Sequence, residues 1–483
     1  MTRPKMPNDY PVAPFKAPVP NALDSSILDE LGSFGVDVDV SDVARADHGR
    51  DWWPLSIPDV AAGRVPHWPG AVVRPRSTAQ VSKVVELASR YLIPITAQGG
   101  RSGVVGGAVA PDGGIALDLT GLDQVIGVDE QSGTVTVEAG VFGPDLEAHV
   151  RQLGWTVGHF PQSFELATVG GWIACRGAGQ FSNRYGKIED IVRSLTVVLS
   201  NGDIVHLGSG APRQAVGPDL LQLFIGSEGA LGVVTEATLV MQRRPDFERR
   251  AAYRFESFAA GLDACRAIFQ RGARPAVLRL YDDIESRRNF EVDGCALIVL
   301  DEGDRLFVDA AMTIVDQECT DASALDVDLV EKWLAHRNDV GALAPLWTNG
   351  YVVDTIEVAG PWASLATMYQ RVTGALASVP EMMVVSVHQS HAYSDGACLY
   401  FTFAGRPSGD VTDFYRTVWD LATNEVLTCG GALSHHHGVG HNRARFVTRA
   451  LGTAFPILEG IKDVLDPNNV MNPGVLGLGH DPW

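Results

Sequence analysis

The stretch that decides the fold of this chain is Ala97–Gly107, which reads AQGGRSGVVGG. Five of its eleven residues are glycine. Glycine adopts positive φ without steric cost and lets backbone amides come close to a ligand. Successive amides in such a turn form a concave anion site, so the stretch suits a pyrophosphate. A tight turn without any ligand is the alternative, because glycine-rich motifs often occur by chance.

Regular secondary structure is predicted immediately before this loop. Ala71–Val73 has the character of a strand, and Ser77 is a good N-cap for a helix over Ser77–Tyr91. Gln80 stands three residues after the cap, where a capping box needs it, and the apolar residues that follow recur at helical spacing. The apolar run Leu92–Ile95 is then predicted to be a short buried strand that leads into the loop.

The residues after the loop mix strand and helix signals. Asn201-Gly202 predicts a hairpin with a type I′ turn, because both residues tolerate positive φ. This mixture favours an α+β arrangement over a regular βαβ array, and the loop does not present a G-x-G-x-x-G fingerprint that opens a helix. The predicted elements are strands at Ile115–Leu119, Thr134–Ala139, Leu195–Leu199 and Ile204–Leu207, and a helix at Gly143–Leu153.

Length, charge and cysteine content narrow the class of protein. With 483 residues, more than one hydrophobic core is expected. The net charge of −20 argues against nucleic acid or an anionic membrane surface as the main partner. The scattered cysteines lack a C-x-x-C pair, and no transmembrane run or signal sequence is evident, so we expect a cytoplasmic protein with reduced thiols. The expected partner is a small-molecule or lipid-like substrate, with peripheral membrane contact and a homodimer left open.

The N-terminal region is predicted to be extended over its first 45 residues. Asp51–Pro54 carries too much aromatic surface for a free linker, so we expect it to dock on a domain as a hydrophobic clasp without a catalytic role. The composition that favours irregular chain comes from six prolines, namely Pro4, Pro7, Pro11, Pro14, Pro18 and Pro20.

Several segments together resemble the FAD-binding domain of the vanillyl-alcohol oxidase/p-cresol methylhydroxylase (PCMH) superfamily. Two more segments, Asp395–Phe401 and Leu433–Gly440, resemble its alkyldihydroxyacetonephosphate synthase branch, which acts in ether-lipid synthesis. The resemblance runs from about Trp53 to the C-terminus and implies an α+β fold. The segments that carry the superfamily resemblance are Ile93–Gly107, Pro161–Gly171, Tyr185–Asp190 and Gly226–Gly232.

The same resemblance implies a division of the chain into four parts. These are an N-terminal extended segment (1–65), a PCMH-type FAD-binding domain of two subdomains (66–245), a cap domain (246–425) and a C-terminal segment that returns to the flavin (426–483). The cap is expected to be an antiparallel sheet with helices on one face. Its predicted elements are helices at Phe258–Arg271, Arg305–Gln317 and Ala363–Leu376, and strands at Ala276–Leu280 and Ala296–Leu300. Asp466–Gly474 is predicted to be a turn-rich structural clamp.

The cofactor implied by the resemblance is FAD. Members that hold FAD covalently often have a histidine in the glycine loop, where this chain has Arg101, and no cysteine lies in the loop. We therefore expect non-covalent FAD, with Arg101 able to contact a phosphate. The residues implied to bind FAD are Ala97, Gln98, Gly99, Gly100, Arg101, Ser102, Gly103, Gln162, Ser163, Phe164, Glu165, Leu166, Ala167, Thr168, Cys175, Arg176, Gly177, Ala178, Glu228, Gly229, Ala230, Leu231, Gly232, Val233 and Val234.

The candidate catalytic residues are histidines and one tyrosine. His159 and Tyr400 match active-site residues of the synthase branch, although by spacing alone Tyr400 could be a core aromatic beside Phe401. Histidine is the natural base near neutral pH, and a phenol can pass a proton. The triple histidine, His435, His436 and His437, could be a metal tract. Neighbours in an extended segment point to opposite faces, so we expect an anion and substrate site and no metal.

The reaction implied by the resemblance is the exchange of an acyl for an alkyl group on dihydroxyacetone phosphate through a flavin N5 adduct, without net redox. The branch has an active-site arginine where this chain reads Leu343-Ala344-Pro345, so Arg337 is the candidate substrate-binding residue. The missing arginine supports the alternative, an FAD-dependent oxidoreductase of a 2-hydroxy acid or alcohol. A flavin-binding protein without catalysis would not need His159 and the histidine cluster together.

Overall fold

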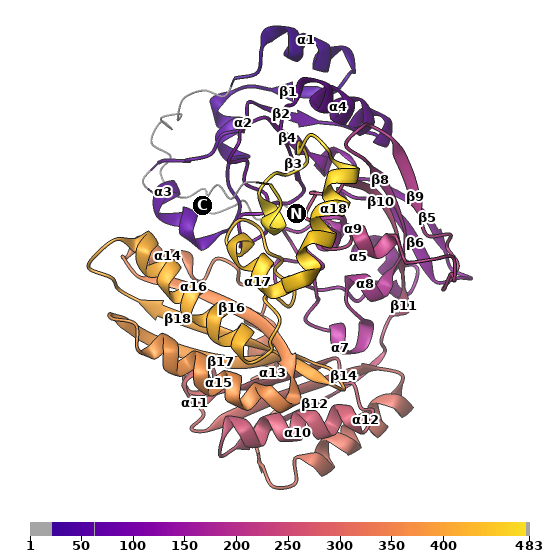
Figure 1. Cartoon of the computed structure of the whole chain (residues 1–483). Helices are drawn as coiled ribbons and strands as arrows, with labels where there is room; N and C mark the ends of the chain where they lie inside the picture. Colours follow the sequence, from indigo (N-terminus) through magenta and orange to yellow (C-terminus); the bar gives the residue numbers. More distant parts are fainter. Residues whose placement is uncertain (1–21, 62, 480–483) are drawn as a thin grey trace.

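A computed structural model describes residues 22–61 and 63–479 of the chain. The fold is α+β, as predicted, with mixed and antiparallel sheets. Figure 1 shows the first half of the chain above a separate sheet built from the second half, while the C-terminal residues return to the upper part. The six N-terminal prolines lie outside the described residues.

The glycine loop leaves a four-stranded sheet. Its order is β1 (Asp37–Asp39), β2 (Ala71–Arg74), β4 (Ile115–Asp118) and β3 (Ile95–Gln98), with β2, β4 and β3 parallel. α4 (Thr78–Tyr91) covers this sheet with its buried valines. The predicted strand at Leu92–Ile95 instead begins at Ile95, because Leu92 adopts the left-handed conformation that ends α4.

The cap of α4 is confirmed in part. The Ser77 hydroxyl accepts from the Gln80 amide at 3.3 Å, as expected. The Gln80 side chain accepts from the Arg76 amide at 2.7 Å and not from that of Ser77. The first hydrogen bond of the predicted capping box is therefore present, whereas the second involves the amide of Arg76, one residue before the cap.

A second sheet of five antiparallel strands follows. Its order is β5 (Val125–Asp129), β6 (Thr134–Glu138), β10 (Val233–Val240), β8 (Val192–Val198) and β9 (Ile204–Leu207). The predicted hairpin β8–β9 is confirmed, but its turn is not type I′. Asn201 has no positive φ, whereas Gly202 has φ 86° and donates to Leu199 O at 2.9 Å. A type I turn followed by a left-handed glycine explains both observations.

The prediction of an extended N-terminal segment is wrong for its described part. α1 (Ser25–Ser33) and α2 (Asp42–Asp47) are helices, and β1 pairs with β2. The Ser41 hydroxyl caps α2, and Leu31 is buried in the core of the first sheet. Local capping and an apolar contact thus outweigh the proline-rich composition of the residues before them.

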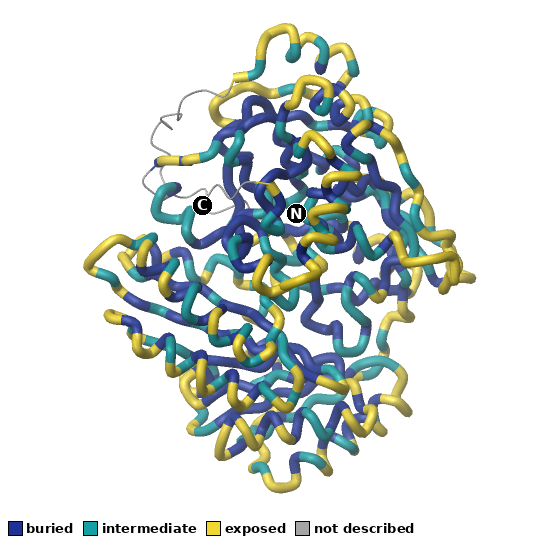
Figure 2. The backbone as a smooth tube through the Cα atoms, in the orientation of Figure 1, coloured by how far each residue is buried: buried dark blue, intermediate teal, exposed yellow. Residues whose placement is uncertain are grey.

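The second half of the chain builds one antiparallel sheet of seven strands. Its order is β15 (Ser323–Ala324), β12 (Phe247–Phe255), β14 (Cys295–Gly303), β13 (Val277–Tyr281), β17 (Met382–Ala392), β18 (Gly396–Gly405) and β16 (Val352–Pro361). The largest core cluster joins it to helices α10 (Phe258–Gln270), α12 (Arg305–Glu318), α15 (Trp362–Ala377) and α16 (Val411–Thr428). Figure 2 shows buried strands beneath helices whose outer sides are exposed.

The opposite face of this sheet carries the residues that matter for the site. A separate cluster there contains Tyr281, Val330 and Trp333, together with Phe181 and Tyr185 from the first half of the chain. The helices on or near this face are α11 (Asp283–Phe290), α13 (Asp328–His336) and α14 (Ala344–Thr348). The remaining helices and strands are α3 (Ile57–Ala61), α5 (Gly143–Gln152), β7 (Trp155–Thr156), α6 (Val169–Ala174), α7 (Ser182–Tyr185), α8 (Ile188–Ile191), α9 (Leu221–Phe224), β11 (Gln242–Arg243), α17 (Val447–Leu451) and α18 (Phe455–Leu465).

Two side chains, one near each end of the chain, form contacts between segments that are distant in the sequence. Trp53 lies against Gly106 and donates from its indole to Tyr415 Oη at 3.1 Å, so the predicted docking of this segment is observed. Asn472 donates to Gly107 O at 3.0 Å and to Glu228 O at 2.7 Å. The C-terminal turn thus contacts the glycine loop directly. Within the described residues, no helix has the length and apolar character to cross a membrane.

Candidate functional site

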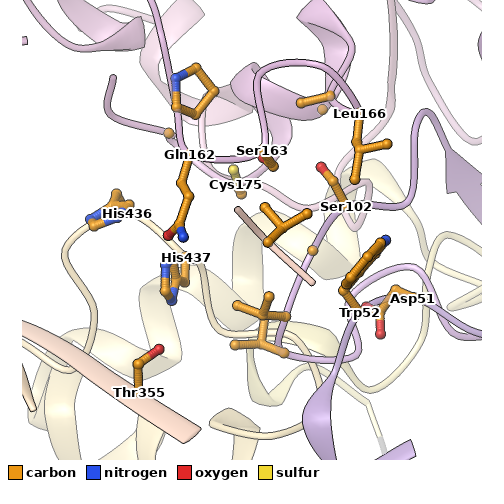
Figure 3. A pocket seen from close by; sticks show the side chains of 18 of the residues that line it. Asp51, Trp52, Ser102, Gln162, Ser163, Leu166, Cys175, Thr355, His436 and His437 are labelled. Carbon is orange, nitrogen blue, oxygen red and sulfur yellow. The ribbon is translucent and has the colours of Figure 1, made fainter. Parts of the chain in front are cut away.

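A cavity of about 870 Å³ lies between the glycine loop and the seven-stranded sheet. Its upper wall carries Ser102, Gln162 and Cys175, and its lower wall carries Thr355 and His437 (Figure 3). Such a volume is typical of ligand sites. The cavity is therefore the candidate active site.

Most of the residues expected to bind FAD line this cavity. The lining members are Ala97, Gln98, Gly99, Gly100, Arg101, Ser102, Gly103, Gln162, Ser163, Leu166, Ala167, Thr168, Cys175, Gly177, Ala178, Glu228, Gly229, Gly232, Val233 and Val234. Phe164, Glu165, Arg176, Ala230 and Leu231 do not line it. Ala230 and Leu231 are buried in hydrophobic clusters instead.

Three of the expected cofactor residues have left-handed backbone although none is glycine. They are Arg101 (φ 52°), Arg176 (φ 55°) and Glu228 (φ 51°). Such conformations cost free energy and concentrate at functional sites. The Arg101 guanidinium donates to Asp47 Oδ2 at 2.7 Å, so its charge is already paired within the protein.

Tyr400 lies on the cavity face of β18. Strand alternation places its neighbour Phe401 in the core behind the sheet. Tyr400 Oη lies 2.8 Å from His437 Nε2, and its ring stacks on that of His388 with centroids 4.9 Å apart. Burial raises the pKa of Tyr400, so the phenol stays protonated. The site therefore holds a neutral phenol in contact with an imidazole.

A buried carboxylate holds the triple histidine in place. Glu357 accepts from the backbone amides of His435, His436 and His437 and from the Ser434 hydroxyl. Burial opposes its ionisation, but Arg443 and the neighbouring histidines lower the pKa of Glu357 to about 2. Burial lowers the pKa of His437 to about 4, against the attraction of Glu357. His437 is therefore neutral at physiological pH.

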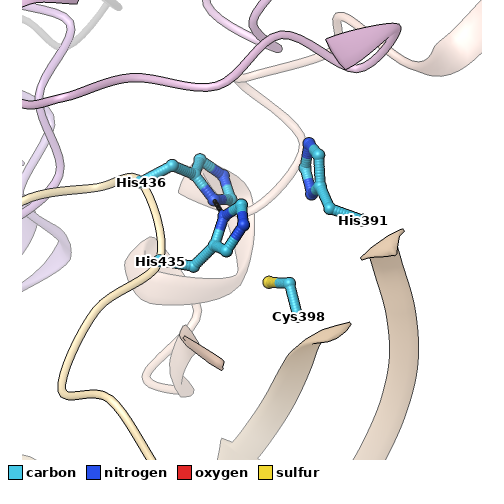
Figure 4. Close-up of side chains that lie close together, drawn as sticks. All are labelled: His391, Cys398, His435 and His436. Atoms are coloured by element: carbon cyan, nitrogen blue, oxygen red, sulfur yellow. Dashed lines mark hydrogen bonds between the residues drawn. The ribbon is translucent and has the colours of Figure 1, made fainter. Parts of the chain in front are cut away.

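His435 and His436 point toward each other, with Nδ1 atoms 2.8 Å apart (Figure 4). The expectation that neighbours here face opposite ways is wrong for this pair, since residues 435–437 form a bend and not a strand. His391 and Cys398 complete a group whose ligand atoms lie within 4.8 Å of one another. Imidazole and thiol are metal donors, and the sequence prediction missed this convergence.

His391 faces the cavity because β17 bulges between Gln389 and His391, where its register with β18 shifts. Such a bulge redirects a side chain relative to simple alternation. His391 Nε2 lies 3.1 Å from Gly179 O, and its Nδ1 lies 2.8 Å from Ser390 Oγ. This imidazole is thus held within the protein on both sides.

Not every predicted histidine reaches the cavity. His436 and His437 line it, whereas His435 and His159 do not. His159 is buried against Trp172, with ring centroids 4.7 Å apart, and burial lowers its pKa to about 3. Its Nε2 would lie 3.7 Å from a side chain at Gly177, which itself lines the cavity. His159 therefore lies behind Gly177 and does not contact the cavity directly.

A cationic part of the cavity contains Arg337, the candidate substrate-binding residue, together with Arg279. Arg279 was missed because it lies on β13, which the sequence marks only as a buried strand. His388 was also missed; its Nδ1 lies 3.0 Å from Glu285 Oε2 and its Nε2 2.7 Å from Arg279 Nη2. No local motif surrounds these residues, so sequence alone offered no signal for them.

Comparisons with known proteins agree with this geometry. A FAD binding domain matches residues 69–208, and the C-terminal domain of FAD linked oxidases matches residues 244–476. An uncharacterised FAD-linked oxidoreductase, YgcU of Escherichia coli O157:H7, is 31% identical over 430 residues, covering 84% of this chain and 89% of the relative. The chain belongs to the FAD-linked oxidase family.

Two further comparisons concern alkyldihydroxyacetonephosphate synthases. Alkyldihydroxyacetonephosphate synthase of Caenorhabditis elegans is 29% identical, covering 84% of this chain and 76% of the relative. A solved structure of an alkyldihydroxyacetonephosphate synthase superposes with a TM-score of 0.79 at 24% identity, covering 95% of this chain and 87% of that one. A solved structure of p-cresol methylhydroxylase superposes with a TM-score of 0.76 at 17% identity, covering 96% of this chain and 99% of that one, which confirms the PCMH-type fold.

FAD is the cofactor that the family indicates, and the cavity residues of this chain fit it. Among the described residues, Gln98 Oε1 and Trp172 Nε1 are buried at the cavity without a hydrogen-bond partner. Gly171 also lines the cavity, and a Cβ there would meet no protein atom closer than 3.4 Å. Gly100 differs, since its Cβ would lie 1.6 Å from Leu166 O. Gly100 is thus required by the protein's own packing, whereas Gly171 leaves room for a ligand.

Proposed function

We propose that this FAD-dependent enzyme catalyses a reaction like that of alkyldihydroxyacetonephosphate synthase. A fatty alcohol would replace the acyl chain of an acyl-dihydroxyacetone phosphate, and a fatty acid would leave, without net redox. The observation that carries the proposal is the contact of Tyr400 with His437 at the cavity, 2.8 Å between Oη and Nε2. The similarity to synthases of this name supports it.

FAD, when bound, supplies an electrophilic ring that accepts a hydride or a carbon nucleophile. The protein has to move protons around that ring. We propose that Tyr400 takes a proton from the substrate while its own hydroxyl proton passes to His437 Nε2. The resulting imidazolium would be stabilised by Glu357, whose Oε1 lies 3.6 Å from His437 Nδ1. Arg337, on the cavity wall, would bind the substrate anion.

A second candidate is an FAD-dependent dehydrogenase or oxidase of a 2-hydroxy acid or alcohol. It is favoured by the residues near the place of the missing arginine, because Leu343, Ala344 and Leu346 all face the cavity. None of these side chains can bind a phosphate. The same tyrosine and histidine would then take the proton of the substrate hydroxyl.

Anaerobic mixing of the FAD-loaded enzyme separates the two candidates. The synthase reaction predicts release of fatty acid from acyl-dihydroxyacetone phosphate with a fatty alcohol present and no net bleaching of the flavin. Full bleaching by a hydroxy acid or alcohol, without acyl exchange, would instead establish the oxidoreductase.

We propose further that FAD is held non-covalently. Arg101 occupies the loop, and burial raises the pKa of Cys175 to about 12, which leaves its thiol protonated and a poor nucleophile. Acid precipitation should release the yellow colour into the supernatant. Colour that stays in the pellet would overturn this proposal.

A further inference from the structure

The histidine loop, residues 435–440, is held by two acidic side chains. Glu357 accepts hydrogen bonds from the backbone amides of its three histidines. Directly after them, the amide of Val439 donates to Glu228 Oε1 at 2.5 Å, and that of Gly440 donates to Glu228 Oε2 at 2.7 Å. The histidine loop therefore directs five backbone amides at only two carboxyl groups.

These two acidic residues belong to different halves of the molecule. Glu357 lies on β16 of the seven-stranded sheet, whereas Glu228 lies between α9 and β10, in the half that carries the glycine loop. Tyr400 on β18 belongs to the same half as Glu357. The histidine loop follows α16 and contacts both acidic residues. Its contact with Glu228 therefore places it relative to the half that does not contain Tyr400.

The backbone of Glu228 is itself fixed in an uncommon conformation. Its φ of 51° is left-handed, which costs free energy in a residue that has a side chain. The Glu228 amide donates to Ala174 O at 2.9 Å, and its carbonyl accepts from the side chain of Asn472 at 2.7 Å. These two hydrogen bonds hold the conformation that directs the carboxyl group at the histidine loop.

Two glycines allow the histidine loop to lie directly against this half. A Cβ at Gly438, which has φ 83°, would lie 2.4 Å from Glu228 Oε1. A Cβ at Gly440, which has φ 50°, would lie 2.2 Å from Val105 O in the glycine loop. Glycine alone combines positive φ with so close an approach at no steric cost. His437 directly precedes Gly438, so the contact with Glu228 constrains where its imidazole lies.

We propose that Glu228 is a positioning residue that sets His437 against Tyr400. Glu357 holds the amide of His437 at 3.0 Å and Glu228 holds the residues that follow, so the backbone of His437 is fixed from both sides. Its Nε2 then lies 2.8 Å from Tyr400 Oη. Proton transfer requires these atoms to stay within hydrogen-bond reach, so a displaced loop would interrupt it. The inference rests on the proposed function only in taking Tyr400 and His437 as the proton-transfer pair.

Nuclear magnetic resonance of the FAD-loaded enzyme, labelled with nitrogen-15 in its histidines, tests this positioning without any turnover. At pH 8 the solution is above the pKa of Glu228, about 7, and above that of His437, about 4, so the imidazole is neutral. The His437 Nε2 resonance is the one that His437→Gln removes. Tyr400→Phe abolishes its hydrogen bond and so shows the direction of the resulting shift. We expect Glu228→Ala to shift the resonance in the same direction.

Turnover gives a second measurement. We expect Glu228→Ala to lower it about 10- to 100-fold, because displacing a reacting group by roughly 1 Å can cost up to about 100-fold. FAD is kept in excess and its occupancy is measured by absorbance, so that loss of the cofactor is not mistaken for loss of positioning. Glu228→Gln keeps one carbonyl acceptor for the loop and should lose less turnover than Glu228→Ala.

Asp410→Ala is the matched control. Asp410 also accepts hydrogen bonds from two successive amides, those of Thr412 at 2.7 Å and Asp413 at 3.0 Å. It is exposed and caps α16, so its loss should lower the free energy of unfolding by about 0.5–2 kcal/mol. The His437 resonance and turnover should both stay at their wild-type values.

Gly438→Ala perturbs the same contact from the side of the loop. The new Cβ would collide with Glu228 Oε1 and displace the loop, so the His437 resonance should shift even if Glu228→Ala folds poorly. Combined with Glu228→Ala, the same substitution should have a smaller effect, because the atom with which it collides is gone.

The proposal is overturned if Glu228→Ala leaves the His437 resonance at its wild-type position, or if Asp410→Ala shifts it equally. A shifted resonance with unchanged turnover would also overturn it, because the position of the imidazole would then not matter for the reaction. Failure of the proposed reactions is a different result. If neither acyl exchange nor substrate oxidation occurs while the resonance depends on Glu228, the positioning role stands and the reaction is another one.

Discussion

The carboxylate of Glu357 lies 3.0 Å from the guanidinium of Arg443, and neither side chain has exposed surface. This ion pair supports the triple histidine, since Glu357 also accepts hydrogen bonds from the backbone amides of His435 and His437. Arg443 donates in addition to Leu433 O at 3.0 Å. The buried ion pair thus fixes the bend that aims His437 at Tyr400.

Glu357→Gln should strongly destabilise the protein, because it leaves the buried charge of Arg443 uncompensated. The expected loss in free energy of unfolding is about 3–5 kcal/mol. Urea unfolding followed by circular dichroism measures it. Glu318→Gln is the control, since its pair with Arg271 is partly exposed and worth about 0–1 kcal/mol. Equal losses in the two variants would contradict the role given to Glu357.

Tyr400→Phe should lower turnover roughly 10²- to 10⁴-fold, since it removes a proton-transfer group. FAD content should stay at the wild-type level, because Tyr400 lies on the sheet wall and not on the glycine loops. Tyr253→Phe is the matched control. It removes an exposed hydroxyl of β12 that donates to Asp316 of α12 at 2.6 Å. Unchanged turnover in Tyr400→Phe would remove this residue from the mechanism.

Glu228 should make stability depend on pH. Burial raises its pKa from 4.5 to about 7, despite the amides of Val439 and Gly440. Between these values the folded protein keeps a proton that the unfolded chain has lost, so stability falls as pH rises, by roughly 1.4 kcal/mol per unit.

The glutamine of Glu228→Gln does not titrate, so the variant lacks this contribution to the pH dependence. We compare the free energy of unfolding of the variant with that of wild type at two pH values, just above 4.5 and just above 7. The difference should shift in favour of the variant by up to about 3 kcal/mol at the higher pH. A difference between the two proteins that does not change with pH would show that Glu228 is ionised throughout.

Gly100→Ala should displace the glycine loop and lower the ratio of FAD to protein, because the new Cβ would lie 1.6 Å from Leu166 O. The absorbance of the purified protein measures this ratio. Gly374→Ala is the control, since Gly374 lies in α15 with open space around it. That variant should keep its FAD and gain about 0.5–1 kcal/mol of stability. Full FAD loading in Gly100→Ala would show that the loop adapts.

Local patterns predicted many of the elements well. The helical spacing of Val81, Val84 and Val85 fixes α4, and the predicted strand Thr134–Ala139 corresponds to β6, whose residues alternate between buried and half-buried. These features depend on neighbours within a few residues, so they can be derived from the sequence. The motif set likewise indicated FAD and the family.

The convergence of distant side chains was decided only by the tertiary structure. Arg279 and His388 are 109 residues apart in the chain, and the pairing of β13 with β17 brings them together. The bulge in β17 turns the buried His391 toward the cavity. Asp47 forms an ion pair with Arg101, which the sequence analysis expected to be able to contact a phosphate. Residue spacing indicates whether a segment is a helix or a strand, but it does not indicate which other segment it packs against. The sequence by itself therefore determined the elements and the cofactor class, whereas strand pairing and packing decided which charges and imidazoles meet in the cavity.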